Sequence, residues 1–255
     1  SDRTAQGTLY FTPYCGSRIS FYDGTRWKLY RFTERSLVLS GLTVNKNYDV
    51  FLYDNAGTLT LELSAAWTAD TLRADVIALQ DGVYVKSGAT TRRYLGTIRC
   101  TQTTPSLTED SAAKRFVWNA YNNTIRPMSA VDVTNSWTYA TAAFRQANAS
   151  TANQVEYVQG LSEQPVECAV FGLVANRADA CVGIGIDSTT ANSGRVLIGN
   201  GSDASPAPLM ARYLGWPGIG YHKLVWLEFG GSGATFYGDN AVTTKQSGLM
   251  AEVMG

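Results

Sequence analysis

One stretch of the chain decides its fold class: Tyr48-Asp49-Val50-Phe51-Leu52-Tyr53, then Asp54-Asn55-Ala56-Gly57, then Thr58-Leu59-Thr60-Leu61-Glu62-Leu63. The last six residues alternate strictly, which places three leucines on one face of a strand. The four residues in the middle include Asp, Asn and Gly, which favour turns. Two alternating runs around such a turn are typical of a β-hairpin. The sequence therefore predicts antiparallel β structure over 48–63.

Short β-type runs continue on both sides of this hairpin. Thr, Val, Tyr, Trp and Phe are frequent, and 24 glycines separate the runs. Further strand candidates are 37–39, 83–85, 94–98, 136–139, 154–158, 166–171, 182–186, 222–229 and 234–237. This pattern predicts an all-β chain with an N-terminal β-barrel or sandwich unit over 1–100 and a C-terminal jelly-roll-like β-sandwich over 125–255.

The segment between the two expected units has a different character. Residues 101–110 are polar and contain a proline, as in a linker or long loop. Within 111–121, Phe116, Val117, Ala120 and Tyr121 are spaced by three and four, which favours one apolar helix face behind a cap at Asp110 or Ser111. We therefore expect a linker and one short helix over 101–124.

Composition excludes several classes of protein. The chain has 255 residues, with 21 Lys and Arg against 21 Asp and Glu, so its formal net charge is zero. An electrostatic nucleic-acid binder needs a surplus of Lys and Arg. Charged residues make up 16%, well below the usual ~25%. A neutral, weakly charged surface suits a subunit of an assembly better than a free protein. No stretch approaches the ~18 consecutive apolar residues of a membrane span, and no signal peptide is visible, so we expect no membrane insertion.

The positions of the few chemically reactive side chains do not match the pattern of a catalytic site. His222 is the single histidine, and Glu228, six residues further along the same strand candidate, would lie roughly 20 Å away. Aspartates such as Asp187 mostly sit in turn-like sequences, where Asp is favoured for backbone hydrogen bonding. The four cysteines have no C-x-x-C spacing and are expected to be buried thiols, although two disulfides remain possible. We therefore expect no catalytic residue, no metal site and no cofactor.

Aromatic residues offer the best candidates for contacts with a ligand or a neighbouring subunit. The chain has six tryptophans beside 14 tyrosines, and most of them are expected to fill β-sandwich cores. Trp216 differs, because Tyr213-Leu214-Gly215-Trp216-Pro217-Gly218 is typical of a loop. Trp216, with Tyr213 beside it, is the favoured contact residue. Exposed loops are expected over 184–194, 199–208 and 213–221.

Several phrases resemble virion proteins of tailed bacteriophages, of the kind described as tail or fibre proteins. In the first hundred residues they are Tyr48–Tyr53, Leu79–Gly88 and Arg92–Thr97, and further along they are Lys114–Asn122 and Gly248–Met250. The likeness covers most of the chain in patches. These phrases are structural and carry no catalytic residue, and they leave both the tail and the head of the particle open as locations.

The resemblance implies a virion structural protein, assembled in the host cytoplasm and acting through oligomeric assembly rather than catalysis. It implies a homo-oligomer, with a trimer favoured, in contact with other virion proteins and with a host surface glycan as a further partner. Arg92, Arg93 and Tyr94 suit an interface, where Arg and Tyr are enriched, although the two arginines also suit a solvated strand edge. The alternatives are a head decoration or head-fibre protein, a carbohydrate-binding module and, less favoured, a polysaccharide-degrading enzyme.

Overall fold

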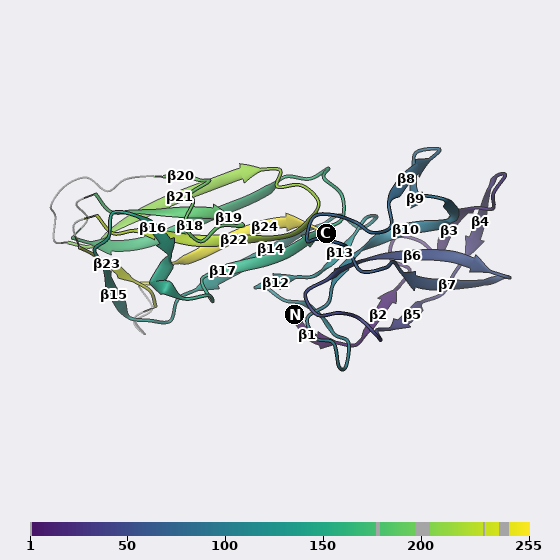
Figure 1. Ribbon diagram of the computed structural model, residues 1–255, viewed down its shortest axis with the longest axis horizontal. Coiled ribbons are helices and arrows are strands. Elements are labelled where there is room, and N and C mark those ends of the chain that lie inside the picture. The colour runs from purple at the N-terminus through teal and green to yellow at the C-terminus, as the bar shows by residue number, and fades with distance from the viewer. Residues whose placement is uncertain (1, 177–178, 197–204, 232, 240–244) are drawn as a thin grey trace.

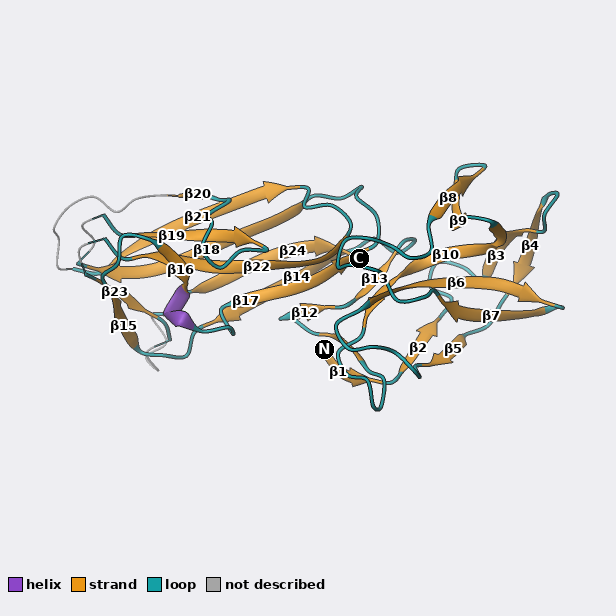
Figure 2. Ribbon diagram, viewed as in Figure 1, coloured by secondary structure: helices purple, strands orange, loops and turns teal. Residues whose placement is uncertain are grey.

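The fold is almost entirely β, as predicted. The computed structural model describes residues 2–176, 179–196, 205–231, 233–239 and 245–255. Within these ranges the one helical element is a single 3-10 turn, η1 (Ala147–Ala149), coloured purple in Figure 2. Two β units lie end to end, and both the N- and C-terminal ends lie near the waist between them (Figure 1).

The N-terminal unit combines one larger sheet with two small ladders. The larger sheet has the order β7-β6-β10-β9-β8, β13 (Val117–Asn119) also pairs with β10, and the ladders are β2-β5 and β3-β4. The strands are β2 (Thr8–Phe11), β3 (Arg18–Tyr22), β4 (Trp27–Arg31), β5 (Arg35–Val38), β6 (Asn47–Asn55), β7 (Thr58–Leu63), β8 (Ile77–Gln80), β9 (Val83–Lys86) and β10 (Ala89–Arg99).

The predicted hairpin is confirmed as β6 and β7. Val50 pairs with Leu63 and Asn55 with Thr58 in an unbroken antiparallel ladder. Ala56 and Gly57 both have positive φ, 49° and 92°. Positive φ at both central residues is what a tight turn between twisted strands requires. The sequence therefore specified both the strands and their register here.

The C-terminal unit is a sandwich of two mainly antiparallel sheets around one core. One sheet contains β12 (Lys114–Arg115), β17, β22 and β16, with β19 also paired to β22; the other has the order β14-β24-β18-β21-β20, with β23 paired to β18 and β15 paired to β23. The strands are β14 (Ile125–Val131), β15 (Ser136–Tyr139), β16 (Phe144–Gln146), β17 (Gln154–Gln159), β18 (Val166–Ala175), β19 (Cys181–Ile186), β20 (Arg195–Val196), β21 (Ala207–Gly215), β22 (Gly220–Phe229), β23 (Ala234–Tyr237) and β24 (Gly248–Met254). All six strand candidates of this half are confirmed.

The expected helix over 111–121 is wrong. Ser111 forms a turn by accepting a hydrogen bond from the Lys114 amide, and β12 (Lys114–Arg115) and β13 (Val117–Asn119) follow. Phe116 and Trp118 are both buried, which is the period-two pattern of a strand. Pairing of β13 with the central strand β10 overrides the weak helical spacing, because the strand gains ladder hydrogen bonds and buries both rings.

The segment 101–124 connects the two units through strand pairing. β11 (Thr108–Asp110) pairs with both β1 (Arg3–Gln6) and β12, and β12 runs parallel to β17 of the sandwich. β13 pairs with β10 of the N-terminal unit. The expected linker is therefore a seam of short strands that continues both units.

Buried polar contacts hold the waist together. Arg73 Nε lies 2.8 Å from Asp49 Oδ2, with both side chains nearly inaccessible, and the same guanidinium donates to the Gly160 carbonyl of the sandwich. Burial raises the pKa of Asp49, against the opposing effects of Arg73, Thr97 and Trp67. The ion pair itself lies within the N-terminal unit, and the bond from Arg73 to Gly160 joins that unit to the sandwich.

Two glycines permit the close approach at the waist. A Cβ on Gly160 would lie 2.0 Å from the Tyr94 hydroxyl, and one on Gly220 would lie 2.2 Å from the Asp70 carbonyl oxygen. The Tyr221 amide donates to that same carbonyl at 3.0 Å. The ends of β17 and β22 therefore contact the N-terminal unit through the backbone of Gly160 and Gly220, where no side chain intervenes.

Candidate functional site

The predicted contact residue Tyr94 is wrong, because it is fully buried. Its ring packs against Phe51 and Trp118, and its hydroxyl bonds Thr97 at 2.7 Å. The register of β10 shifts between Tyr94 and Gly96, which makes a bulge, and β10 is buried on both faces from Tyr94 onward. A side chain enclosed in this way cannot touch another molecule, so Tyr94 belongs to the core.

Arg92 and Arg93 leave β10 on opposite faces and are both anchored within the chain. Arg92 pairs with Glu62 at 2.7 Å and stacks on Tyr53. Arg93 donates through Nη1 to both Ser20 oxygens and through Nε to the Tyr121 hydroxyl. Its guanidinium carbon lies 4.5 Å from the centre of the Tyr121 ring. Both side chains keep some exposure, so these internal contacts leave their expected interface role as a prediction.

Trp216 and Tyr213 belong to the sandwich. Trp216 is 61% exposed in the turn between β21 and β22, as expected for a contact residue. Tyr213 is half-buried and packs against the sandwich core. Their turn lies at the end of the sandwich that meets the N-terminal unit, since Gly220 contacts Asp70. Among the described residues, no hydrogen bond or ring contact joins this pair to Arg92 or Arg93.

The structure describes only part of the loops that were expected to face outward from the sandwich. Asp187 to Gly194 follows β19, outside any strand, as expected. The expected loop 199–208 lies outside the described residues from 199 to 204, and its last two residues begin β21. The turn 216–219 faces the waist rather than the free end of the sandwich.

A cleft opens in the N-terminal unit between the small ladders and the turn that follows β13. We call it the hairpin cleft; its volume is about 670 Å³, and its walls include Tyr10, Tyr14, Arg18, Arg93, Asn119 and Tyr121. This size falls within the ~300–1,000 Å³ of small-molecule sites. Residues from β2, the loop after it, β3 and β10 meet residues 119–122 here because β13 pairs with β10. The cleft is large enough to hold a small molecule or a few sugar units and is our candidate binding site.

The walls of the hairpin cleft are aromatic and basic. Tyr10, Tyr14 and Tyr121 are 64%, 79% and 47% exposed. Arg18 and Arg93 line the cleft, and no Asp or Glu is among its lining residues. Sequence analysis missed this site, because its residues come from segments a hundred positions apart. Arg93 was singled out as an interface residue, and Tyr121 was assigned to the apolar face of a helix.

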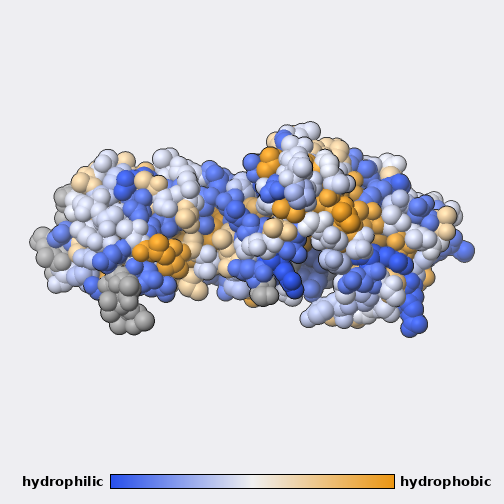
Figure 3. All heavy atoms as spheres, turned by 90° about the horizontal axis from the view of Figure 1, so that it is seen from below, coloured by the Kyte–Doolittle hydropathy of each residue, from blue (hydrophilic) through white to orange (hydrophobic). Residues whose placement is uncertain are grey.

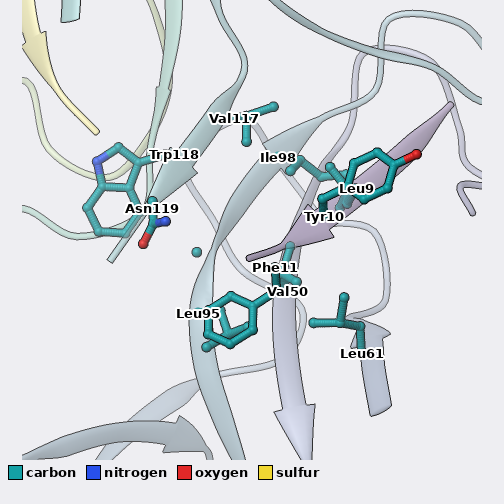
Figure 4. Close-up of a pocket in the computed structure, with 11 residues that line it drawn as sticks. Leu9, Tyr10, Phe11, Val50, Leu61, Leu95, Ile98, Val117, Trp118 and Asn119 are labelled. Atoms are coloured by element: carbon teal, nitrogen blue, oxygen red, sulfur yellow. The ribbon is translucent and has the colours of Figure 1, made fainter. Parts of the chain in front are cut away.

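A small apolar cavity adjoins the cleft. It has a volume of about 70 Å³ and shares Tyr10, Phe11 and Asn119 with the cleft. Figure 4 shows Leu9 and Phe11 of β2 converging on it with side chains of β6, β7, β10 and β13. It has space for no more than a few water molecules. We therefore treat it as a packing gap below the cleft.

His222 has a carboxylate partner that sequence analysis did not assign. His222 Nδ1 lies 2.8 Å from Asp187 Oδ2, and the imidazole is buried beside the Tyr157 ring. Burial disfavours ionisation of Asp187, but hydrogen bonds from His222 and the Lys223 amide lower its pKa overall. His222 Nε2 has no hydrogen-bond partner among the described residues. A nucleophilic triad needs a hydroxyl or thiol at that atom, so the pair is a dyad of a buried imidazole and an exposed carboxylate.

Glu228 is a second buried carboxylate with a full set of partners. Its side chain is inaccessible and accepts hydrogen bonds from Trp137, Arg145 and the Asn148 amide. Burial raises its pKa, against the effect of these donors. Because every described partner comes from the sandwich itself, the group holds β15, β16 and η1 onto β22.

The outer face of the β14-β24-β18-β21 sheet exposes apolar side chains beside charged ones. Ala169 of β18 pairs with Met250 of β24, and Phe171 pairs with Met210 of β21. Phe171 and Met250 are 46% and 61% exposed and are diagonal cross-strand neighbours, so they form one small apolar surface. Leu214 is 65% exposed but pairs with Glu167, so the Arg212–Glu167 ion pair separates it from them. We call this side of the sheet the outer face. In the view of Figure 3, apolar residues gather over the N-terminal unit and in a smaller group on the sandwich.

Searches for a metal site, a membrane-spanning helix and similar proteins give no further indication of function. Among the described residues, no three His, Cys, Asp or Glu side chains gather in a way that would hold a metal ion. No helix in the same ranges is long and apolar enough to span a membrane. Cys100, Cys168 and Cys181 are buried free thiols, and Cys15 is exposed. No protein-family model matches the chain, and no curated protein is significantly similar to it.

Proposed function

We propose that this protein is a structural subunit that assembles with copies of itself through the outer face of its sandwich. One observation carries the proposal: Phe171 and Met250 are exposed as diagonal neighbours on a regular sheet surface, with Met210 beside Phe171. Contiguous apolar surface of this kind costs free energy in water and is usually covered by a partner. A second copy is the partner that is always present at equal concentration.

The charged groups of the outer face also suit association between copies. Arg212 pairs with Glu167 on this face, and Glu252 is exposed beside them. The face therefore offers both signs of charge beside its apolar residues, and interfaces combine both kinds of group. A zero net charge adds no long-range repulsion between identical copies.

The waist supports a mechanical role. Arg73, Asp49 and Gly160 join the two units through buried contacts, so the molecule behaves as one elongated body. The buried carboxylate Glu228 and the exposed carboxylate Asp187 are held by groups of the same chain. Together with the sequence resemblance, these features support a virion protein of a tailed bacteriophage, of tail, fibre or head-decoration type, with three copies favoured.

The test is the mass of the purified protein in solution. Light scattering at micromolar concentration should give a multiple of 27.6 kDa, with three copies expected. Phe171→Glu combined with Met250→Glu should return the mass of one chain, because charges would be buried without partners. Leu79→Glu is the matched control, since Leu79 is also 60% exposed but lies in the N-terminal unit. A wild-type monomer at 100 µM would overturn the proposal.

The location in a particle needs a separate experiment. A reconstruction of an intact virion should show density for this elongated molecule at a symmetric position on the tail or the head. Contact through the outer face in that reconstruction would support the proposal. A soluble protein that never enters the particle would contradict it.

A further inference from the structure

The hairpin cleft has the features of a binding site for a ligand with flat faces. Tyr10, Tyr14 and Tyr121 expose their rings around one volume of about 670 Å³. Exposed tyrosine rings supply rigid contact area and stack on planar or flat molecular faces. The C–H faces of sugar rings are such surfaces. Three rings around one cleft therefore fit a chain of several sugar units.

The charge of the cleft is one-sided. Arg93 and Arg18 line it and no carboxylate does, although the chain as a whole is neutral. Arg18 is exposed and has no hydrogen bond or ion pair within the described part of the chain. An arginine pair with no acidic counterpart favours an anionic group on the ligand.

Arg93 is held in a fixed position toward the cleft. Its Nη1 donates to the carbonyl and hydroxyl of Ser20, and its Nε donates to Tyr121. Its Nη2 has no partner among the described residues, so both N–H groups of that nitrogen remain free. A guanidinium that is already immobilised loses little entropy when it binds a carboxylate.

Amide groups beside Arg93 complete the polar side of the cleft. The Oδ1 atom of Asn119 accepts from the Tyr121 and Asn122 amides, which leaves its Nδ2 free to donate. Asn122 is exposed, and its side-chain amide has no partner in the described ranges. Amides that donate and accept match the hydroxyl groups of a saccharide, since each hydroxyl can do both.

We propose that the hairpin cleft binds an acidic oligosaccharide. The sugar faces stack on Tyr10, Tyr14 and Tyr121, the carboxylate pairs with Arg93 and Arg18, and the ring hydroxyls bond to the asparagine amides. The site is independent of the outer face, so the proposed assembly and this binding can fail separately. Single-stranded nucleic acid also combines charge with flat rings, but two arginines in a neutral protein supply little of the phosphate neutralisation that such binding needs.

The experiment measures binding of the full chain to a panel of defined saccharides. The probes are oligomers of uronic acids and of nonulosonic acids, each with its neutral methyl-ester counterpart, and a ten-nucleotide oligothymidylate. We expect at least one acidic oligomer to bind, and its methyl ester to bind about tenfold more weakly, since one charged hydrogen-bond pair accounts for such a factor.

Variants assign the binding to the cleft. Arg93→Gln and Tyr14→Ala should each weaken it about tenfold, and Tyr14 is so exposed that its loss leaves folding intact. Arg92→Gln is the matched control, because Arg92 lies next to Arg93 but on the opposite face of β10. Circular dichroism confirms that each variant folds.

Three outcomes would overturn the inference. The first is no binding of any acidic oligomer at millimolar concentration. The second is binding that Arg93→Gln and Tyr14→Ala leave unchanged. The third is tighter binding of the oligothymidylate than of every saccharide, which would assign the cleft to nucleic acid. The mass measurement of the assembly is unaffected by each of these results.

Discussion

The N-terminal unit and the sandwich are built from the same kind of strand but pack in different ways. The sandwich closes two seven-stranded sheets over one core, which includes Trp226 and Phe236. The N-terminal unit covers its larger sheet with two-stranded ladders, and these leave the hairpin cleft between them. Wide sheets bury their inner faces completely, whereas short ladders leave gaps at their ends. The N-terminal unit therefore offers a concave site, and the sandwich offers a flat surface.

Arg73→Ala tests whether the two units depend on each other, and it should have the largest effect. The substitution leaves the buried Asp49 carboxylate without its cationic partner and removes the donor to Gly160. Breaking a buried pair in this way costs about 3–5 kcal/mol. Urea unfolding followed by tryptophan fluorescence measures the loss.

Arg92→Ala is the control for Arg73→Ala. Arg92 and Glu62 form a pair in which both side chains keep a quarter to a third of their exposure. Exposed pairs contribute about 0–1 kcal/mol, so this variant should unfold close to wild type. Equal losses for the two variants would mean that the waist contact does not couple the units.

Phe236→Ala against Phe11→Ala compares the two cores directly. Phe236 is 1% exposed between the sheets and stacks on Trp137, so its truncation should cost about 3–5 kcal/mol. Phe11 stacks on Phe32 but also borders the cleft, so truncation there should cost roughly half as much. Thermal unfolding of both variants gives the difference. A larger loss for Phe11 would show that the ladders pack as tightly as the sandwich.

Gly160→Ala probes the fit at the waist. The added methyl group would overlap the Tyr94 hydroxyl and the Trp118 ring, and such overpacking costs about 1–3 kcal/mol. Gly7→Ala is the matched control, because its Cβ would meet the nearest atom at an ordinary 3.5 Å. We expect the control to change the free energy of unfolding by less than about 1 kcal/mol. An equally stable Gly160→Ala variant would mean that the units can separate slightly without penalty.

The smallest expected effect is a difference in pH dependence within the sandwich. The raised pKa of Glu228 means that the folded protein holds this proton more tightly than the unfolded chain. Stability therefore decreases as pH rises through and above 4.5, the ordinary pKa of the group, and Glu228→Gln should remove that decrease. Urea unfolding at several pH values between 3 and 7 measures the slope.

Asp132 gives the opposite sign and serves as the control. Burial raises the pKa of its carboxyl, but hydrogen bonds from Asn153, Thr134 and Asn148 outweigh burial and lower it overall. Its contribution to stability is present above about pH 4 and is lost as pH falls through the lower, folded-state pKa. Asp132→Asn should therefore flatten the acid side of the profile. The same slope change in both variants would contradict these assignments.

The sequence predicted strands well, because their pattern is local. The hairpin of β6 and β7 and the six sandwich strands follow from alternation and turn residues. The helix over 111–121 failed because its apolar residues fit both periods, and only pairing with β10 decides between them. Local patterns therefore determined the elements but not the way in which segment 101–124 joins them.

The candidate sites were predictable only in part, because they depend on contacts between distant segments. Exposure of Trp216 followed from its Gly- and Pro-rich surroundings. The hairpin cleft and the bond between His222 and Asp187 could not be predicted from the sequence, since each joins residues 35 or more positions apart. Tyr94 was misplaced because β10 is buried on both faces from Tyr94 onward, and no local residue pattern marks a strand that is covered on both sides.

The strand seam over 101–124 limits how this protein can be divided. Residues 114 and 115 cover part of the β17 edge, while β13 covers β10 on the other side. A cut after residue 124 would divide β12 from β17 and leave the edges of these two strands with unsatisfied backbone groups, which invite aggregation. Recombination between relatives at this point would meet the same obstacle. The two halves are therefore expected to be inherited and engineered together, even though each has its own hydrophobic core.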